Sequence, residues 1–105
     1  MQYEVYTTEK FEKEVKKLFK DEQAQIKRIF PQLKENPYVG DQLRYRFLRE
    51  KRIKKKRIYY LVYDDLNAVL VVALSGKKTQ QETINHIIQY FDEYRSYLEK
   101  VLRKV

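Results

Sequence analysis

The chain has 105 residues, enough for one domain with a single buried core and too few for two. Its 23 lysines and arginines outnumber its 15 acidic residues, which gives a formal net charge of +8, and the absence of cysteine excludes disulfides, thiolate nucleophiles and cysteine metal sites. No apolar run approaches the roughly 20 residues that a membrane span needs, and the opening MQYEVYTTEK lacks the apolar core of a signal peptide, so we expect a cytoplasmic protein with no membrane partner.

The chain opens with an alternating stretch, QYEVYTT, which predicts a short strand with Tyr3 and Val5 on one face. From Thr8 the apolar residues follow a helical period instead, with lysines and glutamates between them, which predicts an amphipathic helix. A second helix with the same spacing follows and ends near Asn36, because Pro37 disfavours helical geometry at the residue before it.

Two further features of this region affect the prediction. Pro31 lies inside the second helix and predicts a kink or an earlier break, because proline has no amide hydrogen and its ring collides with the preceding turn. The segment NPYVGDQL that follows is typical of a turn, in which Gly40 supplies backbone freedom.

Two or three strands are predicted in the middle of the chain. RYRFLRE, residues 44–50, alternates, and RIYYLVY, residues 57–63, is rich in aromatic and β-branched side chains. AVLVVALS, residues 68–75, is almost entirely apolar, as expected of a central strand that is covered on both faces. The intervening DDLN predicts a hairpin turn.

The last predicted element is a long helix over residues 80–104. Thr79 with Glu82 three residues later forms a capping-box pattern at its start. About 25 helical residues would run roughly 37 Å, longer than the expected width of the domain. We therefore expect its distal apolar stripe to meet a partner helix or a second copy of the chain, through Phe91, Leu98 and Leu102.

The predicted order is β-α-α-β-β-β-α, with no repeats, linkers or low-complexity segments. This order is typical of a single α+β domain over residues 1–105, in which a helical pair and a final helix pack on a small, largely antiparallel sheet.

The positive charge is concentrated in one segment of this chain. Residues 44–57 contain nine lysines and arginines and one acid, Glu50, whereas the remaining residues are neutral in sum. A charged run is often no more than a solvated loop. Because this run accounts for the whole net charge, we interpret it as a binding surface for a polyanion, a nucleic acid or an anionic membrane.

Other conspicuous residues have simpler interpretations. We interpret the three tyrosines of residues 57–63 as packing residues rather than platforms for base stacking. His86 is the only histidine and has no partner nucleophile in the sequence, so we expect it on the surface of the last helix. Asp64 and Asp65 are interpreted as turn residues rather than metal ligands.

Taken in order, four segments resemble the RelE/ParE superfamily, the toxins of type II toxin–antitoxin pairs. They are the opening strand with FEKEVKKL, the turn NPYVGDQL, the segment RIYYLVYDD, and the apolar VLVVAL followed by the basic GKK. The resemblance covers residues 1 to about 83. It implies two N-terminal helices packed on a small twisted antiparallel sheet, and an acidic antitoxin protein as partner.

The RelE-like branch of this superfamily implies a metal-independent endoribonuclease that acts on mRNA in the ribosome and needs no cofactor. In that chemistry the ribose 2′-hydroxyl attacks the neighbouring phosphate, so the enzyme holds the RNA, transfers a proton and stabilises charge on the phosphate. By position, Arg57 would stabilise the transition-state phosphate, and Lys77 or Lys78 would supply a second catalytic cation. The residues implied to grip the RNA are Arg49, Lys51, Arg52, Lys54, Lys55 and Lys56.

The sequence departs from this pattern at one place. Where ribonuclease members have a tyrosine or histidine shortly after the last basic pair, this chain has TQQETIN, and the nearest candidates, His86 and Tyr90, come later. The departure leaves open a weakened nuclease, in which a lysine serves as acid or base. Two alternatives also stay open: a non-catalytic ParE-like inhibitor of a protein target such as gyrase, and a plain RNA-binding protein.

Overall fold

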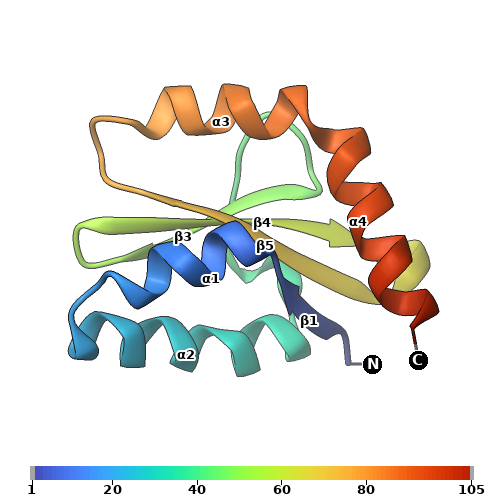
Figure 1. Cartoon of the computed structure of the whole chain (residues 1–105), viewed down its shortest axis with the longest axis horizontal. Helices are drawn as coiled ribbons and strands as arrows, with labels where there is room; N and C mark the ends of the chain where they lie inside the picture. Colours follow the sequence, from blue (N-terminus) through green and yellow to red (C-terminus); the bar gives the residue numbers. More distant parts are fainter. Residues whose placement is uncertain (1, 105) are drawn as a thin grey trace.

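A five-stranded sheet lies between two pairs of helices in the computed structural model, which describes residues 2–104 (Figure 1). None of the helices in this range is long and apolar enough to cross a lipid bilayer. The elements in chain order are β1 (Glu4–Thr7), α1 (Glu9–Lys16), α2 (Lys20–Glu35), the 3-10 helix η1 (Pro37–Val39), β2 (Asp41–Gln42), β3 (Leu48–Ile53), β4 (Lys56–Tyr63), the 3-10 helix η2 (Asp64–Leu66), β5 (Ala68–Ser75), α3 (Gln80–Gln89) and α4 (Phe91–Arg103).

The strands are arranged in the order β1-β5-β4-β3-β2. All neighbours are antiparallel except β1, which pairs in parallel with β5 from Glu4↔Ala68 to Thr7↔Val71. The predicted α+β class, with two N-terminal helices on a largely antiparallel sheet, is confirmed. The apolar β5 has strand neighbours on both sides and helices over both faces, as its composition predicts (Figure 1).

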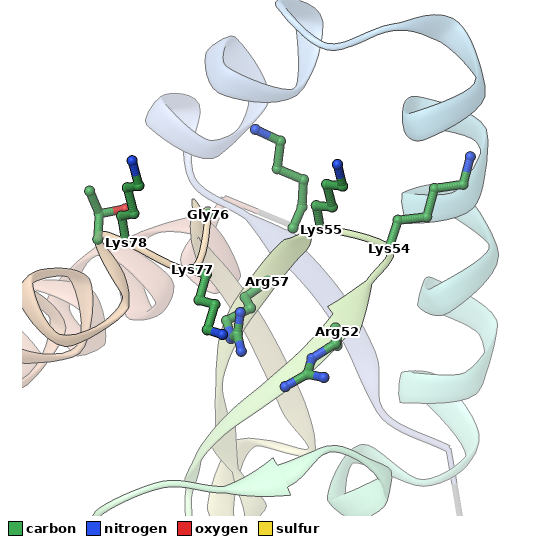
Figure 2. A pocket seen from close by; sticks show the side chains of 9 residues that line it. Arg52, Lys54, Lys55, Arg57, Gly76, Lys77 and Lys78 are labelled. Carbon is green, nitrogen blue, oxygen red and sulfur yellow. The ribbon is translucent and has the colours of Figure 1, made fainter.

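The hairpin of β3 and β4 carries most of the basic run (Figure 2). β3 begins at Leu48 rather than at residue 44, so the predicted strand bounds are wrong in their first half. The Leu48 amide donates to the Tyr45 carbonyl at 3.1 Å, which closes a turn there. β3 instead continues to Ile53, and Lys54 begins the reversal with a φ of 50°, a left-handed conformation that costs free energy for any residue with a Cβ atom.

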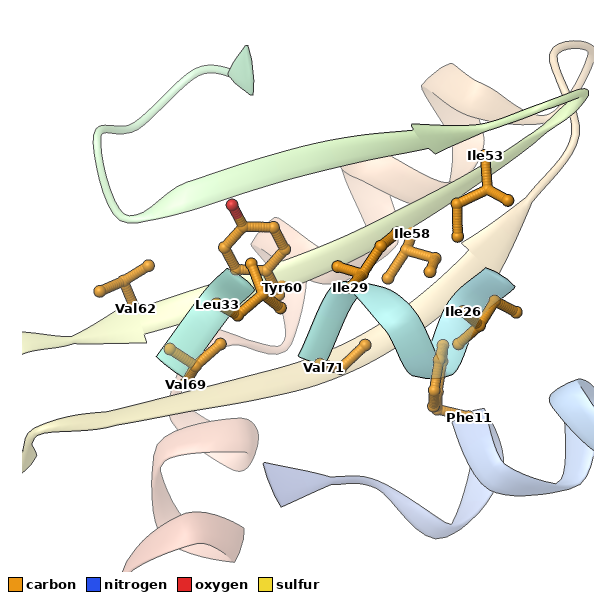
Figure 3. Packing of buried hydrophobic residues seen from close by; sticks show 10 residues of the cluster. All are labelled: Phe11, Ile26, Ile29, Leu33, Ile53, Ile58, Tyr60, Val62, Val69 and Val71. Atoms are coloured by element: carbon orange, nitrogen blue, oxygen red, sulfur yellow. The ribbon is translucent and has the colours of Figure 1, made fainter. Parts of the chain in front are cut away.

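Two apolar cores lie on opposite faces of the sheet. The first, shown in Figure 3, is formed with α1 and α2 and contains Phe11, Ile26, Ile29, Leu33, Ile53, Ile58, Tyr60, Val62, Val69 and Val71. The second is formed with α3 and α4 and contains Leu48, Tyr59, Leu61, Ala68, Leu70, Val72, Ile84, Ile87 and Leu98. Successive residues of β4 therefore point alternately into the first and the second core. Tyr59 and Tyr60 are both fully buried, which confirms the prediction that they are packing residues.

Two local signals in the helices do not have the predicted effect. Of the kink or earlier break predicted at Pro31, the break does not occur, because α2 continues to Glu35. Ile29 and Leu33 are buried on either side of the proline, so core packing outweighs its local cost of about 3 kcal/mol, and Pro31 itself is exposed. Helix α3 starts at Gln80 as expected, but the Thr79 side chain makes no capping hydrogen bond.

The C-terminal helical stretch bends at Tyr90 instead of running straight over residues 80–104. Tyr90 has φ −111° and ψ 24°, outside the helical range, and separates α3 from α4. The Cα trace measures 33 × 27 × 24 Å, so a straight helix of roughly 37 Å would overhang it. Beyond the bend, Leu98 is fully buried in the second core. Phe91 and Leu102, the other residues of the apolar stripe, pack against the same core of the same chain.

Candidate functional site

A basic hollow of about 780 Å³ opens between the β3–β4 hairpin and the loop from β5 to α3 (Figure 2). Seven of the nine residues that line it are cations, and the other two are glycine and threonine. The lining residues are Arg52, Lys54, Lys55, Lys56, Arg57, Gly76, Lys77, Lys78 and Thr79. β4 and β5 are antiparallel neighbours, and Arg57 pairs with Ser75. This pairing brings Lys77 and Lys78 close to Arg57, although they lie about twenty positions later in the sequence.

Arg57 is the most buried cation of the hollow, with its side chain 9 % exposed. Its neighbour directly across the hairpin is Arg52, so two like charges are paired on one face of the sheet. The Arg57 Nε atom lies 3.4 Å from Oε1 of Glu50, whose side chain is 7 % exposed. This contact is an ion pair without hydrogen-bond geometry, because the Nε–H group has no hydrogen-bond acceptor within residues 2–104.

A small polar network surrounds this ion pair. The Gln80 side-chain amide, in the first turn of α3, donates to Oε1 of Glu50 at 2.8 Å. The Tyr59 and Ser75 hydroxyls lie 2.8 Å apart. Burial raises the pKa of Tyr59, although its contact with Ser75 opposes that shift, so the phenol stays protonated and is not a candidate general base.

The two lysines of GKK point in different directions. Both line the hollow, but Figure 2 shows the Lys77 side chain directed toward Arg57 and the Lys78 side chain directed away from it. At the hairpin tip, Lys54 is directed toward α2, where its Nζ atom lies 3.2 Å from Oδ2 of Asp21. The lysine lowers the pKa of the Asp21 carboxyl, chiefly through the hydrogen bond it donates.

Two residues predicted to bind RNA lie outside the hollow. Arg49 donates to the carbonyls of Arg46 at 2.8 Å, Gly40 at 3.1 Å and Tyr38 at 3.3 Å, so its guanidinium holds the turn before β3. Lys51 pairs with Ile58 of the first core and therefore faces the side of the sheet that α1 and α2 cover.

His86 and Tyr90, the histidine and tyrosine that follow GKK, do not line the basic hollow either. His86 is exposed, as predicted, and lines a separate hollow of about 330 Å³ with Lys10, Glu14 and Tyr94 among others. Its ring centroid is 4.6 Å from that of Tyr90. Within residues 2–104, no cluster of three or more histidine, aspartate or glutamate side chains is placed to hold a metal ion.

Sequence reasoning missed Glu50 and Gln80, which contact each other beside Arg57. A signal for Glu50 was present, because it is the one acid in residues 44–57 and lies two positions from Arg52, on the same face of a strand. No local pattern marks Gln80, whose contact with Glu50 spans 30 positions.

Comparison with solved structures identifies the fold. A variant of the E. coli toxin RelE in the free state superposes with a TM-score of 0.69 at 20% identity, over 83% of this chain and 99% of that one. The chain has the fold of the RelE toxins. No model of a protein family matches the sequence, and no curated protein matches it either.

The RelE fold is also found in two similar toxin–antitoxin complexes. One is RelBE2 of Mycobacterium tuberculosis, with a TM-score of 0.65 at 21% identity, over 73% of this chain and 100% of that one. The other is the archaeal RelE–RelB complex of Pyrococcus horikoshii OT3, with a TM-score of 0.63 at 18% identity, over 73% and 97% of the respective chains. These RelE-like structures confirm the architecture that the sequence resemblance implied.

Proposed function

We propose that the chain is the toxin of a toxin–antitoxin pair and that it cleaves mRNA at the basic hollow. The observation that carries this proposal is that seven cations from two separate segments line one hollow of a RelE fold. A hollow lined by cations, with no acid among its lining residues, attracts a polyanion and concentrates its phosphates near Arg57.

The geometry supports metal-independent transesterification of RNA. The 2′-hydroxyl of the ribose gives up its proton and its oxygen attacks the adjacent phosphorus, while the bond from phosphorus to the 5′-oxygen of the next nucleotide breaks. The leaving 5′-oxygen takes up a proton, and the products are a 2′,3′-cyclic phosphate and a 5′-hydroxyl. Arg57 is buried and preorganised at the hollow, so it would stabilise the charge that develops on the phosphate. Lys77, whose side chain is directed toward Arg57, is the amine that would transfer a proton, and Arg52 and Lys54 to Lys56 would hold the RNA backbone.

One observation favours a second candidate, an RNA-binding toxin that blocks without cutting. The hollow is lined by lysine, arginine, glycine and threonine, whereas His86 lies at a different hollow. A lysine is less available as a general base than a histidine at neutral pH, because its ordinary pKa of about 10.4 keeps most of it protonated. Slow or absent cleavage with intact binding would therefore identify this candidate.

The experiment compares Arg57→Ala with the triple variant Lys54→Ala/Lys55→Ala/Lys56→Ala. Cleavage of ribosome-bound mRNA and binding of a single-stranded RNA are measured for each, together with growth arrest on expression. Arg57→Ala should reduce cleavage by about 10²-fold or more while affinity falls little, because six lining cations remain. The triple variant should weaken binding instead, and Lys77→Ala should reduce cleavage more than Lys78→Ala.

The matched control is Arg28→Ala, which removes one exposed cation of α2 away from the hollow. It should leave both cleavage and binding within about twofold. If the unaltered protein arrests growth but cuts no RNA, and gyrase copurifies with it, the nuclease proposal is wrong and the ParE-like alternative replaces it. Coexpression with an acidic antitoxin should relieve growth arrest in either case.

A further inference from the structure

The burial of Arg57 requires compensation. A cation with a side chain 9 % exposed has lost most of its hydration, and such a group is stable only when it is paired. Its partner across the hairpin is another cation, Arg52, which adds repulsion. The lysines that line the hollow add further electrostatic repulsion to the charge of Arg57.

Glu50 supplies the missing negative charge. It lies on β3 two residues before Arg52, directly opposite Tyr59, and is therefore a diagonal neighbour of Arg57 on the same face of the sheet. Its Oε1 atom is 3.4 Å from Arg57 Nε and it does not line the hollow. The carboxylate thus contacts the guanidinium without lining the space that a phosphate would occupy.

Gln80 fixes the orientation of this carboxylate. Its amide donates to the same oxygen, Oε1, at 2.8 Å, and the residue belongs to the first turn of α3. The loop carrying Lys77 immediately precedes that turn. The contact therefore couples the start of α3 to the position of Arg57 on β4.

We propose that Glu50, oriented by Gln80, is a positioning residue that holds Arg57 for the phosphate of the RNA. Glu50 is nearest to Nε, so the two Nη groups remain for a bidentate contact with phosphate oxygens. An arginine that is held in place before binding loses less side-chain freedom when the phosphate arrives. This inference rests on the proposed RNA-cleaving function of the hollow.

The role predicts opposite effects on rate and affinity. Glu50→Gln keeps the size of the side chain and an oxygen for Gln80, but removes the charge beside Arg57. We expect single-turnover cleavage of ribosome-bound mRNA to slow by about tenfold or more, because Arg57 is no longer held. Affinity for a single-stranded RNA carrying a 2′-O-methyl group at the cleavage site should stay equal or rise by up to about threefold, because the local positive charge increases.

The matched control is Asp21→Asn. It also removes one negative charge beside a cation of the hairpin, Lys54, at an exposed ion pair remote from Glu50. Its cleavage rate should stay within about twofold of that of the unaltered protein. A parallel loss of rate in Asp21→Asn and Glu50→Gln would show that net charge, and not the position of Arg57, matters, and would overturn the proposal.

A direct readout is the mobility of the Arg57 side chain. Its Nε–Hε signal in a 15N NMR spectrum is assigned by its loss in Arg57→Lys, and its heteronuclear NOE reports motion on the ps–ns timescale. We expect a high NOE in the unaltered protein and in Asp21→Asn, a clear fall in Glu50→Gln, and a smaller fall in Gln80→Ala.

An unchanged NOE in both Glu50→Gln and Gln80→Ala would overturn the positioning role, whatever the cleavage assays show. If Glu50→Gln does not fold, Gln80→Ala carries the same measurement, because Gln80 is only half-buried. If the unaltered protein cuts no RNA, the proposed nuclease function fails, and the NOE still decides whether Glu50 holds Arg57.

Discussion

Gly40 occupies a position where no larger residue fits. Its amide donates to the Tyr60 hydroxyl at 3.0 Å, and its carbonyl accepts from Arg49 at 3.1 Å. A Cβ atom at this residue would lie 2.5 Å from the Tyr60 hydroxyl oxygen and 2.6 Å from the Glu50 carbonyl oxygen. The constraint is therefore the close approach of the Gly40 backbone, at the end of η1, to β3 and β4, since its φ of −76° is ordinary for any residue.

Gly40→Ala should lower the free energy of unfolding by about 1–3 kcal/mol, because the added Cβ atom would overlap both the Glu50 backbone and the buried Tyr60 side chain. Urea denaturation monitored by circular dichroism measures the change. Gly76→Ala is the control, because nothing lies within 4 Å of a Cβ atom built there. Equal stabilities of the two variants would contradict the steric explanation.

Asp64 joins three parts of the chain through two tyrosines. Tyr38 donates to its Oδ2 at 2.7 Å and Tyr3 donates to its Oδ1 at 2.8 Å. These hydrogen bonds, the one from Tyr38 first, lower the pKa of Asp64. Burial, with the bond to Asp64, raises the pKa of Tyr38 to about 12, so the hydroxyl remains a donor at neutral pH.

The sign of the pH dependence follows from the lowered pKa. The stabilisation by Asp64 should be complete above the unfolded-state pKa of about 3.9 and should disappear as the pH falls through the lower folded-state value. In Asp64→Asn, the free energy of unfolding should change less between pH 5 and pH 2 than in the unaltered protein. Urea denaturation over that range is the measurement, and Tyr38→Phe should weaken the dependence in the same direction. Parallel curves for Asp64→Asn and the unaltered protein would show that Asp64 is uncoupled from folding.

At the scale of the elements, the bend at Tyr90 decides where α4 packs. Its amide donates to both His86 and Ile87 carbonyls, at 3.2 and 3.1 Å, so the hydrogen bonding of α3 continues to the bend. Beyond the bend, Leu98 is fully buried in the second core, and Phe91 and Leu102 pack partly buried against that core. α4 is therefore an integral part of the domain's packing rather than an overhanging arm.

Leu98→Ala should consequently destabilise the protein by about 2–5 kcal/mol, the usual range for a buried leucine. The exposed Ser96 of the same helix provides the control, since Ser96→Ala should change the unfolding free energy by no more than about 0.5 kcal/mol. Urea denaturation gives both values. A small effect of Leu98→Ala would mean that α4 leaves the sheet readily in solution, and would favour self-association through its apolar stripe.

The spacing of apolar residues in the sequence predicted helices and strands correctly where tertiary packing favours the same structure as the local pattern. Tyr3 and Val5 do face the first core, and β5 is as buried as its apolar run indicates. Periodicity failed where tertiary contacts decide: the bend at Tyr90 accompanies the burial of Leu98 in the second core, and α2 continues past Pro31, where Leu33 is buried in the first core. At the site, the cations Arg57 and Lys77 were predictable from charge and resemblance, whereas the contact of Gln80 with Glu50 depends on a three-dimensional arrangement that no short pattern encodes.

At the scale of the whole molecule, the position of the charge matters more than its amount. The net charge of +8 alone would attract RNA to every face of the protein. The hollow instead gathers seven cations over one region, while exposed cations on α2, such as Lys27, Arg28 and Lys34, lie away from it. Two triple variants, one at the hollow and one on α2, each remove three positive charges. Comparing them distinguishes RNA binding at the hollow from a general electrostatic attraction to the whole protein.

Lys54→Ala/Lys55→Ala/Lys56→Ala should reduce the slope of log affinity against log salt concentration by up to about two, because each lost phosphate contact on a single strand contributes roughly 0.7. The control Lys27→Ala/Arg28→Ala/Lys34→Ala lowers the net charge equally and should leave that slope nearly unchanged. Fluorescence anisotropy of a labelled single-stranded RNA, titrated from 50 to about 300 mM KCl, measures both slopes within the range where surface charges are progressively screened. If the two variants lower the slope equally, RNA responds to the overall charge of the protein, and the basic hollow is not its binding surface.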